Sequence, residues 1–472
     1  MKHIKTDIVI LGAGSGGLSV AAGAAQMGAD VTLLEPAEMG GDCLNFGCVP
    51  SKALIAAASV AHTAFRSETF GVTTGAPQVD YAAAMDHVKR ARDTIAPHDS
   101  QERFEGLGVR VIREAGRFVS EDEIETDTCR IKARRIVIAT GSRPLVPPID
   151  GIEDVPYLTN ETLWDLRERP DHLLIIGGGP IGIEMAQAHR RLGCAVTVIA
   201  GARALPKDEP EFSALLLDRL RNEGIEVVEG TNATAAARDG DGIVVDTDDG
   251  RRFTGSHLLV AVGRKANTEG LDLDKAGIKT TKTGVEVDDR LRTANRRVYA
   301  IGDAAGGLQF THVANYHAGI VVRQAALGVP AKARTDHLPW TTYTRPELAH
   351  VGLTEQQARE KHGDRLRVVR LDYDQNDRAV TEAETAGMIK VMVARGRPVG
   401  ASIVGAQAGD LIALWSLAIA NNLKMSQISS MVAPYPTLAE INKRVAGAYF
   451  TPTLFENDTV KGLVRLVQRW LP

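Results

Sequence analysis

The chain has 472 residues, of which 44% are hydrophobic and 24% are charged, a composition typical of a soluble globular protein with about three domains. A formal net charge of −4 gives no reason to expect nucleic-acid binding. The apolar run Ile8–Leu11 is too short for a signal-peptide core or a membrane span, and no targeting segment is visible, so we expect a cytoplasmic protein. Only four cysteines occur, which excludes a secretory disulfide framework.

The first predicted elements form a strand–helix–strand unit. A buried strand, Asp7–Leu11, is followed by a glycine-rich segment, Gly12–Gly17, and an alanine-rich helical stretch. A second strand, Asp30–Leu34, ends in Glu35, which can accept hydrogen bonds from an adenosine ribose. All four parts agree with the dinucleotide-binding fingerprint, so the sequence predicts a Rossmann-type site here.

Each glycine of this fingerprint has its own physical role. Gly12 makes the tight turn after the strand, and Gly14 lets the backbone approach a pyrophosphate. Gly17 lets the helix pack closely on the strand. The N-terminus of the helix, which includes Ser15, then faces the phosphates.

The segment Gly40–Lys52 carries two cysteines, Cys43 and Cys48, separated by four residues. In an ideal helix their Cα atoms would lie about 7.5 Å apart along the axis, whereas a disulfide requires less than roughly 7 Å. The backbone must therefore leave the helix between them if they pair, and Gly47 permits this. Because so short a loop constrains little chain entropy, we expect redox chemistry from this pair.

With Val-Pro-Ser-Lys after its second cysteine, this segment resembles the redox-active motif of the flavoprotein disulfide reductases, a family that includes dihydrolipoyl dehydrogenase, glutathione reductase and mercuric reductase. The resemblance covers essentially the whole chain. It implies a flavoprotein pyridine nucleotide-disulfide oxidoreductase that passes electrons from NAD(P)H through FAD to a Cys43–Cys48 disulfide and on to a disulfide or other acceptor. The alternatives are a mercuric-reductase-like reductase of a metal or quinone and a redox-sensing flavoprotein.

A second fingerprint follows later in the chain. The strand Leu173–Ile176 leads into Gly177–Gly182 and a helix that contains Glu184, and the next strand, Ala195–Ile199, ends at Ala200. Two fingerprints predict two nucleotide cofactors. The resemblance assigns FAD to the first and a nicotinamide nucleotide to the second.

The residues after the second fingerprint indicate which nicotinamide nucleotide binds. An acid at the end of its second strand would bind the ribose 2′-hydroxyl of NAD, but Ala200 stands there. Arg203 and Lys207 follow and can hold a 2′-phosphate. We therefore expect NADP(H) in preference to NAD(H); the alternative is that both cations are solvated loop residues.

The resemblance also implies roles for individual side chains. Cys48 is the thiol next to the flavin, and Cys43 exchanges with the substrate. Lys52 lies by the flavin, paired with Glu184 of the nucleotide domain. Asp303, at the end of the predicted strand from Val298, hydrogen-bonds the ribityl chain of FAD.

The complete set of expected cofactor contacts contains residues of both fingerprints and of two further elements that resemble those of the family, Ala-Thr-Gly at Ala139–Gly141 and Gly-Asp at Gly302–Asp303. No metal-binding residues are expected. For FAD the set is Gly12, Gly14, Ser15, Gly17, Glu35, Lys52, Ala115, Thr140, Gly141, Asp303 and Thr311. For NAD(P) it is Gly177, Gly179, Gly182, Ala200, Arg203, Lys207 and Gly263.

The predicted fold class is α/β, with two Rossmann-type nucleotide-binding domains and a C-terminal α+β dimerisation domain. The first part of the FAD domain spans residues 1–147, the NAD(P) domain 148–265, the second part of the FAD domain 266–337 and the interface domain 338–472. The resemblance implies a homodimer.

Two positions depart from the family pattern. The family carries His-Pro-Thr followed by a glutamate, donated to the partner's active site, whereas this chain has Tyr435 before Pro-Thr and then Glu440. A phenol titrates near ~10 and an imidazole near ~6.5, so Tyr435 is a poor base at neutral pH. Asp42 stands where threonine is commoner, and its carboxylate is expected to raise the pKa of a neighbouring thiol.

The final segment, Val460–Leu471, has apolar residues at helical spacing and basic residues around them. Such a helix can touch a membrane surface or a partner. We interpret it as a surface helix rather than as a membrane contact.

Overall fold

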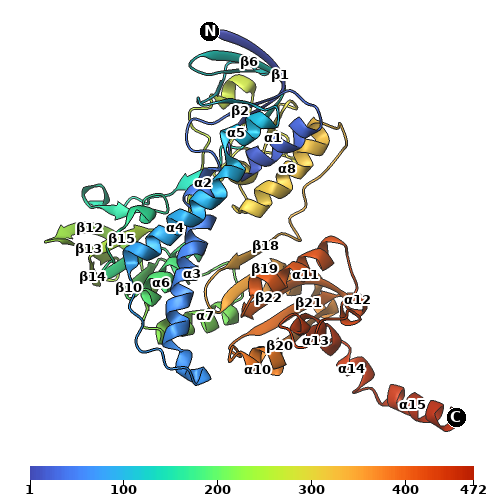
Figure 1. The fold of residues 1–472 in the computed structure, drawn as a ribbon. Coiled ribbons are helices and arrows are strands. Elements are labelled where there is room, and N and C mark those ends of the chain that lie inside the picture. Colours follow the sequence, from blue (N-terminus) through green and yellow to red (C-terminus); the bar gives the residue numbers. More distant parts are fainter. Residues whose placement is uncertain (472) are drawn as a thin grey trace. The chain divides into compact units, whose positions relative to one another are not determined.

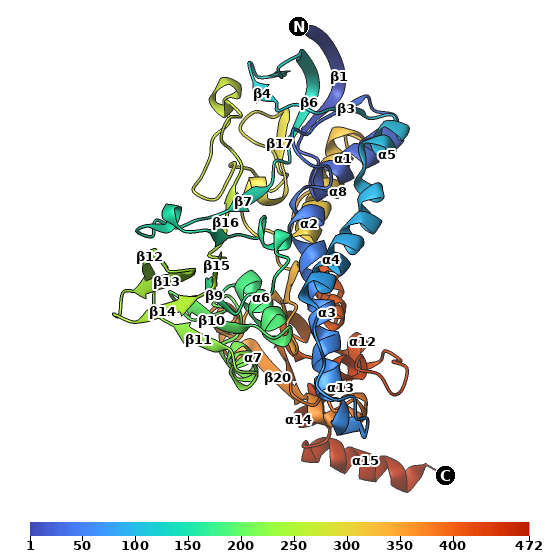
Figure 2. The same ribbon diagram turned by 60° about the vertical axis from the view of Figure 1, so that its left-hand side comes forward.

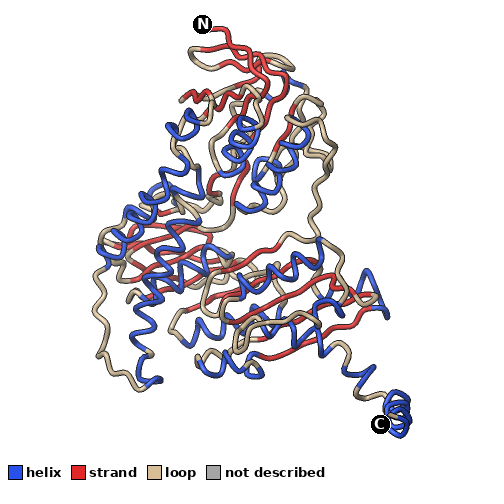
Figure 3. The backbone as a smooth tube through the Cα atoms, turned by 45° about the vertical axis from the view of Figure 1, so that its right-hand side comes forward, coloured by secondary structure: helices blue, strands red, loops and turns tan. Residues whose placement is uncertain are grey.

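The computed structural model of the protein describes residues 1–471 of the chain. These residues form two compact units (Figures 1 and 3). The first comprises Met1–Arg203 and Gly224–Arg334, and the second comprises Ala204–Glu223 and the described residues from Thr335 onward. Each unit combines helices with its own sheets.

The first unit begins with a seven-stranded sheet of order β3-β2-β1-β6-β5-β4, in which β17 pairs with β6. Its long central strands, β1 and β6, are parallel, and their buried apolar residues form the core of this region. Helices α1 (Ser15–Gln26) and α8 (Thr311–Ala325) pack against each other, as Figure 1 shows. The strands are β1 (Lys2–Leu11), β2 (Val31–Leu34), β3 (Arg110–Ile112), β4 (Arg117–Phe118), β5 (Glu123–Glu125), β6 (Cys129–Ile138) and β17 (Val298–Ala300).

The same strand–helix–strand arrangement recurs in a five-stranded parallel sheet of order β11-β10-β9-β15-β8. Helix α6 (Pro180–Arg191) packs on β9 and β10 (Figure 2). A three-stranded antiparallel sheet and the short pair β7–β16 complete the unit. The strands are β7 (Ser142–Pro144), β8 (Tyr157–Leu158), β9 (His172–Ile176), β10 (Ala195–Ala200), β11 (Glu226–Glu229), β12 (Ala233–Asp239), β13 (Gly242–Thr247), β14 (Arg252–Gly255), β15 (His257–Val260) and β16 (Arg264–Ala266).

The remaining helices of the first unit are α2 (Gly41–Asn45), α3 (Cys48–Phe65), α4 (Tyr81–Ile95) and α5 (Gln101–Gly106). The stretch Gly41–Phe65 is, by length and composition, apolar enough to cross a membrane. It is broken into α2 and α3, and α3 packs on α4 and α6 within this unit.

The second unit contains a five-stranded antiparallel sheet of order β18-β19-β22-β21-β20. Helix α11 packs on β19 and β22, and the buried Trp415 donates its indole N–H to Asn442 at 2.7 Å. The strands are β18 (Pro339–Thr342), β19 (Glu347–Gly352), β20 (Leu366–Asp372), β21 (Met388–Ala394) and β22 (Arg397–Gly405). The helices are α7 (Pro210–Asn222), α9 (Glu355–His362), α10 (Asp377–Thr381), α11 (Ala408–Ala420), α12 (Met425–Ser429), α13 (Glu440–Ala448), α14 (Thr451–Leu454) and α15 (Asp458–Trp470).

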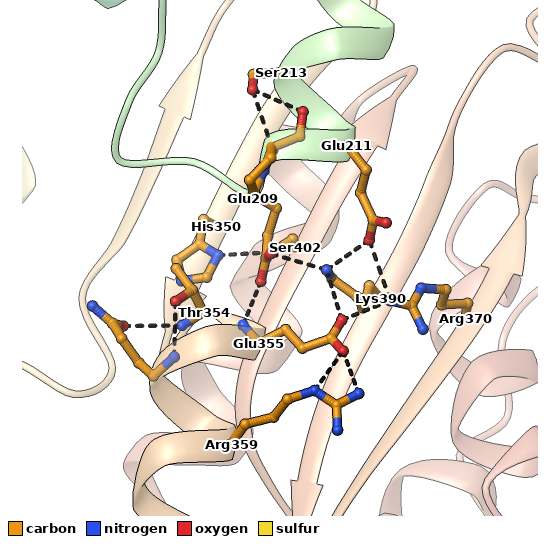
Figure 4. A network of polar contacts seen from close by, with 12 residues as sticks. Glu209, Glu211, Ser213, His350, Thr354, Glu355, Arg359, Arg370, Lys390 and Ser402 are labelled. Carbon is orange, nitrogen blue, oxygen red and sulfur yellow. Dashed lines mark hydrogen bonds and ion pairs between the residues drawn. The ribbon is translucent and has the colours of Figure 1, made fainter. Parts of the chain in front are cut away.

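A buried lysine in β21 forms ion pairs with glutamates at the start of α7 (Figure 4). The ammonium of Lys390 lies 2.9 Å from Glu209, 2.6 Å from Glu211 and 3.1 Å from Glu355, and only 2% of its side chain is exposed. Burial lowers the pKa of Lys390, but the hydrogen bonds to these carboxylates raise it further than burial lowers it. A buried charge is tolerated here because it is surrounded by partners.

The predicted fold class is confirmed in both units. Each glycine-rich segment joins a strand to a helix, as the two fingerprints predict. The predicted domain boundaries stay predictions. Helix α7, which the sequence assigns to the second nucleotide domain, belongs by its contacts to the second unit.

Candidate active site

The two cysteines lie on either side of a break between two helices. Cys43 belongs to α2, and Cys48 is the first residue of α3. Between them Gly47 has φ −120° and ψ −106°, outside the helical region, as the sequence predicts. Both side chains are thiols, so the structure describes the reduced pair rather than the predicted disulfide.

A hydrogen bond between the two thiols makes them unequal. It is the main reason why the pKa of Cys48 falls to about 6, and Thr311 and the charge of Lys52 lower that pKa further. The same hydrogen bond, with burial, raises the pKa of Cys43. The Sγ atom of Cys48 lies 3.3 Å from the Oγ1 atom of Thr311 at the start of α8. Near neutral pH Cys48 is therefore the thiolate and Cys43 the thiol.

An ion pair next to the cysteines joins α3 to the helix of the second fingerprint. The Nζ atom of Lys52 lies 2.8 Å from the Oε2 atom of Glu184. The Glu184 side chain is buried, while that of Lys52 is partly exposed. The two residues are far apart in the sequence, so the structure brings together the pair that the resemblance implied.

The first glycine-rich segment has the geometry of a phosphate cradle. Gly12 has φ +105°, and a Cβ atom there would lie 2.4 Å from the carbonyl oxygen of Ala139. A Cβ atom on Gly17 would lie 1.9 Å from the carbonyl oxygen of Gly12. On Gly14 it would meet only the Cα atom of Gly41, at 3.9 Å. There is thus no room for a side chain at Gly12 and Gly17, where the helix packs on the strand. There is room at Gly14, where a pyrophosphate would approach.

Glu35 stands at the end of β2 with its carboxylate buried. Its Oε2 atom accepts a hydrogen bond from the backbone N–H of Ala13 at 2.7 Å, and Oε1 accepts one from Ala37 at 2.9 Å. These bonds fix the carboxylate beside the open cradle, and each oxygen keeps a lone pair for a ribose hydroxyl. The residues present therefore fit a bound adenine dinucleotide at this site.

The other expected FAD contacts lie in loops of the same unit. Gly141 has φ +69°, and the hydroxyl of Thr140 donates to the carbonyl of Asn267 at 2.6 Å. Ser15 is the first residue of α1. Ala115 is exposed in the turn between β3 and β4.

A network that the sequence does not predict connects the cysteine helix to Asp303. Arg264, almost buried, lies 2.9 Å from Asp42 and donates to the Ser142 hydroxyl at 2.7 Å. That hydroxyl donates to Asp303 at 2.5 Å. Burial raises the pKa of Asp303, while Ser142 and Arg264 oppose the rise. The only signal in the sequence was the position of Arg264 at the predicted end of the NAD(P) domain, residues 148–265.

Asp42 has a smaller effect on the thiols than its position suggests. The hydrogen bond between Cys43 and Cys48 is the largest cause of both pKa shifts, and the Asp42 charge adds only a minor rise to each. The carboxylate is paired with Arg264 and accepts a further hydrogen bond from Asn160 at 3.1 Å. These partners compensate its charge locally.

The second glycine-rich segment repeats the first. Gly177 has φ +124°, and a Cβ atom there would lie 2.3 Å from the carbonyl oxygen of Ala261. A Cβ atom on Gly182 would lie 2.0 Å from the carbonyl oxygen of Gly177, and one on Gly179 would meet nothing within 4 Å. Gly263, at φ +139°, is equally open. This cradle also fits a dinucleotide.

The residues after β10 differ from those after β2. Ala200 ends the strand and is buried, and it carries no carboxylate. Arg203 is partly buried in the first unit, whereas Lys207 is exposed and belongs to the second unit. The two cations that the sequence groups together are thus assigned to different units.

Tyr435 and Glu440 lie close in sequence within the second unit. The Tyr435 side chain is 70% exposed, and its hydroxyl donates to Asp377 at 3.0 Å. This hydrogen bond raises the pKa of Tyr435. Glu440 begins α13, and its Oε2 atom is buried without a hydrogen-bond partner among residues 1–471. Nothing in the sequence indicated Asp377.

A hollow of about 320 Å³ lies beside Cys43 in the first unit. It is large enough for a small ligand. Its polar side chains include Asp99, whose pKa is raised by burial. The sequence did not identify this space. The lining residues are Ser15, Leu18, Ser19, Ala22, Cys43, Leu44, Val49, Ile95, Asp99, Arg103, Phe104, Thr311 and Asn315.

Known proteins match the chain over almost its whole length. It is 36% identical to a mercuric reductase of Streptomyces lividans, over 95% of this chain and 97% of that protein. It is 34% identical to a dihydrolipoyl dehydrogenase of Geobacillus stearothermophilus, over 94% and 96% of the two chains. The Cu(II) complex of the HOCl-induced flavoprotein disulfide reductase RclA from Escherichia coli matches with a TM-score of 0.84 at 27% identity, over 93% of this chain and 99% of that one.

Two family profiles cover the chain. The profile of the pyridine nucleotide-disulphide oxidoreductases matches residues 6–318. The profile of the dimerisation domain of the same family matches residues 338–446. Together with the two dinucleotide cradles and the cysteine pair, they identify the chain as a member of the FAD-dependent pyridine nucleotide-disulphide oxidoreductase family.

Proposed function

We propose that this enzyme takes electrons from NADPH, passes them to the Cys43–Cys48 pair and delivers them to a small electrophilic acceptor. The observation that carries the proposal is the unequal thiol pair, with a Cys48 pKa lowered to about 6, next to the Lys52–Glu184 ion pair. When bound, the flavin accepts a hydride from the nicotinamide and supplies two electrons to the cysteine disulfide. The protein binds, orients and protonates the reacting groups.

The two cysteines have different roles in this proposal. With a disulfide acceptor, Cys43, which borders the hollow, first gives its proton to the hydrogen-bonded Cys48 thiolate and then attacks one sulfur of the acceptor, which breaks the acceptor's S–S bond and releases one thiolate. The proton on Cys48 passes to this released thiolate. The Cys48 thiolate then attacks the sulfur of Cys43, which restores the Cys43–Cys48 disulfide and releases the second half of the acceptor as a thiolate that takes a proton from solvent. The ammonium of Lys52 would stabilise the negative charge of a reduced flavin. The buried carboxylate of Glu184 holds the Lys52 side chain in position.

NADPH is the proposed electron donor. Ala200 offers no carboxylate to a ribose 2′-hydroxyl, so the interaction typical of NAD binding is missing. Arg203, which belongs to the same unit as the second cradle, is the candidate partner of a 2′-phosphate.

The acceptor class follows from Tyr435. Reduction of an ordinary dialkyl disulfide requires a proton for the leaving thiolate, and a positioned acid–base group contributes about 10²–10⁴-fold. The hydrogen bond to Asp377 raises the pKa of Tyr435 further and so weakens it as an acid. The proposed acceptor is therefore one whose reduction does not depend on a proton from this residue, namely a disulfide with a low-pKa leaving thiol, a metal ion, or a quinone that takes up its protons from solvent after electron transfer.

A metal ion is the second candidate within this class. Proteins similar to this one include mercuric reductases and a flavoprotein disulfide reductase solved as a Cu(II) complex. Residues 1–471 contain no group of three or more His, Cys, Asp or Glu side chains able to hold a metal ion. A soft metal ion would therefore bind to the two thiols alone.

The match to the dimerisation domain supports a homodimer. In such a dimer, the family pattern has the segment around Tyr435 and Glu440 complete the partner subunit's active site. We propose the same arrangement here.

The test measures kcat/KM for NADPH-dependent reduction of lipoamide, glutathione disulfide, a low-pKa aromatic disulfide, a quinone and Hg²⁺. Wild type, Tyr435→Phe and Tyr435→His are compared across pH. We expect slow turnover with lipoamide and glutathione disulfide, little change in Tyr435→Phe, and a gain of ~10-fold or more in disulfide reduction near pH 7 in Tyr435→His.

Fast lipoamide reduction by the wild type that disappears in Tyr435→Phe would contradict the proposal, because the tyrosine would then be an effective acid–base catalyst. The aromatic disulfide serves as the internal control. Its leaving thiolate needs no proton, so all three proteins should reduce it at similar rates.

A further inference from the structure

Helix α15 (Asp458–Trp470) lies beyond the dimerisation-domain match, which ends at residue 446. Its start is well defined, because Asn457 accepts hydrogen bonds from the backbone N–H groups of Thr459 and Val460. In Figures 1 and 3 the helix projects away from the sheet of its unit. The helix thus lies outside the residues that the family profile matches and has its own N-cap.

One side of α15 is apolar and uncovered. Its apolar residues follow the i, i+3, i+4, i+7 spacing of a single helix face. Leu463 is 60% exposed and Trp470 81% exposed, and of the face only Val460 is partly covered, so most of it is left uncovered by the described part of the chain. Packing therefore does not explain why the face is apolar. Its residues are Val460, Leu463, Val464, Leu466, Val467 and Trp470.

The opposite side of α15 is cationic. Lys461, Arg465 and Arg469 follow one another at intervals of four and form a single stripe. The only acid on the helix is Asp458, which lies 3.8 Å from Lys461. The chain as a whole has a net charge of −4, so this concentration of positive charge is local.

The shape of the apolar face favours a surface over a second helix. Pairing with another copy of α15 would cover only a narrow seam, as in a coiled coil, whereas this face spans nearly half the circumference. It would also bring two identical cationic stripes close together. A helix lying in the plane of a lipid surface buries a broad apolar face and keeps its basic side chains among anionic headgroups.

We propose that α15 is a reversible membrane anchor, which binds in the plane of an anionic lipid surface with its apolar face inserted. Trp470, with its large amphipathic ring, suits the boundary between headgroups and acyl chains. The sequence alone favoured a plain surface helix; the exposure of most of the apolar face supports the stronger assignment. The anchor would bring the enzyme to the membrane without a spanning segment.

The experiment is flotation of the FAD-loaded protein with phosphatidylcholine vesicles that contain either no anionic lipid or about 30% phosphatidylglycerol, enough to give an attractive surface charge. The wild type should partition into the anionic vesicles and much less into the neutral ones. Each basic residue near an anionic surface contributes about fivefold. The triple variant Lys461→Gln/Arg465→Gln/Arg469→Gln should therefore bind about 100-fold more weakly.

Two further variants separate the contributions. Leu463→Ser/Val467→Ser keeps all charges but removes two apolar side chains, and it should also lose vesicle binding. The matched control Lys279→Gln/Lys282→Gln/Arg296→Gln removes the same net charge from exposed positions in the first unit and should bind like the wild type. All variants should keep the NADPH oxidation rate of the wild type in solution.

Three results would overturn the proposal. One is a wild type that does not float with anionic vesicles. Another is equal binding of wild type and the charge variant. The third is a dimer that dissociates, by analytical ultracentrifugation, when the chain is truncated after Asn457, since the apolar face would then be covered by a second copy of the chain.

Discussion

The two nucleotide-binding segments share one backbone geometry and differ at the residue that ends the second strand. A Cβ atom on Gly17 or on Gly182 would lie 1.9 or 2.0 Å from the carbonyl oxygen of the glycine five residues earlier. Gly14 and Gly179 both leave open space. The second strand of the first segment, β2, is followed directly by the buried Glu35, whereas that of the second segment, β10, ends in Ala200.

This comparison distinguishes the residues that are required for packing from the residue that is expected to contact the nucleotide. The glycines that meet another backbone atom are required for helix and strand to pack, so they are the same in both segments. The residue that follows or ends the second strand is not fixed by such a packing requirement: Glu35 accepts hydrogen bonds from the backbone N–H groups of Ala13 and Ala37, whereas Ala200 has no side-chain acceptor. We expect this residue to influence which nucleotide binds.

The largest effect is expected from breaking this backbone geometry. Gly17→Ala forces a Cβ atom against the carbonyl oxygen of Gly12, and backbone cannot move as a flexible side chain can. We expect a loss of about 3 kcal/mol or more in unfolding free energy and loss of FAD. Thermal unfolding and flavin absorbance measure the two effects.

Gly14→Ala is the matched control, because its Cβ atom meets no protein atom closer than 3.9 Å. The FAD-free protein should keep its unfolding temperature but bind FAD more weakly, since the methyl group occupies the phosphate approach. A Gly17→Ala protein that is as stable as the wild type would show that the two segments tolerate a looser packing than the comparison implies.

An intermediate effect, on nucleotide preference, is expected from placing at the end of β10 the same acid that follows β2. Ala200→Glu introduces the acid that Glu35 provides in the other segment, so it should accept hydrogen bonds from a ribose diol and repel a 2′-phosphate. We expect the ratio of kcat/KM for NADPH over NADH to fall by ~10–100-fold. Ala200→Gln has nearly the same size without the charge and should change the ratio much less. A wild type that prefers NADH would contradict the interpretation of this loop.

The smallest effect concerns the ion pair that joins the cysteine helix to the second segment. The charge of Lys52 contributes, after the hydrogen bonds from Cys43 and Thr311, to the low pKa of Cys48 of about 6. A lowered pKa means that the thiolate is present above about pH 6 and is lost below it. Lys52→Met should move this transition to higher pH.

The measurement is the pH dependence of iodoacetamide alkylation of Cys48 in a Cys43→Ser background, where the serine hydroxyl can still donate a hydrogen bond. Lys52→Arg keeps the charge and serves as the control. An unchanged midpoint in Lys52→Met would mean that the ammonium does not act on the thiol.

Much of this architecture could be predicted because its signals are local. The glycine spacing, the apolar strands and the residues between Gly40 and Lys52 each follow from short-range backbone requirements. They predicted both cradles and the helix break at Gly47, which the structure contains.

The remaining features depend on contacts between distant segments. Arg264 reaches Asp42 and Ser142 only after the sheets are assembled, and Asp377 meets Tyr435 in the same way. No periodicity or spacing in the sequence links such residues. The broad apolar face of α15 was visible in the sequence, but its exposure was not, because burial depends on tertiary packing.

The central claim is that electrons from NADPH reach the Cys43–Cys48 pair. The most direct test adds one equivalent of NADPH to the oxidised FAD-loaded protein without oxygen and counts the thiols that react with a thiol reagent under denaturing conditions. The account predicts a gain of about two thiols per chain in the wild type and none in Cys43→Ser. Oxidation of NADPH with no new thiols in the wild type would contradict it.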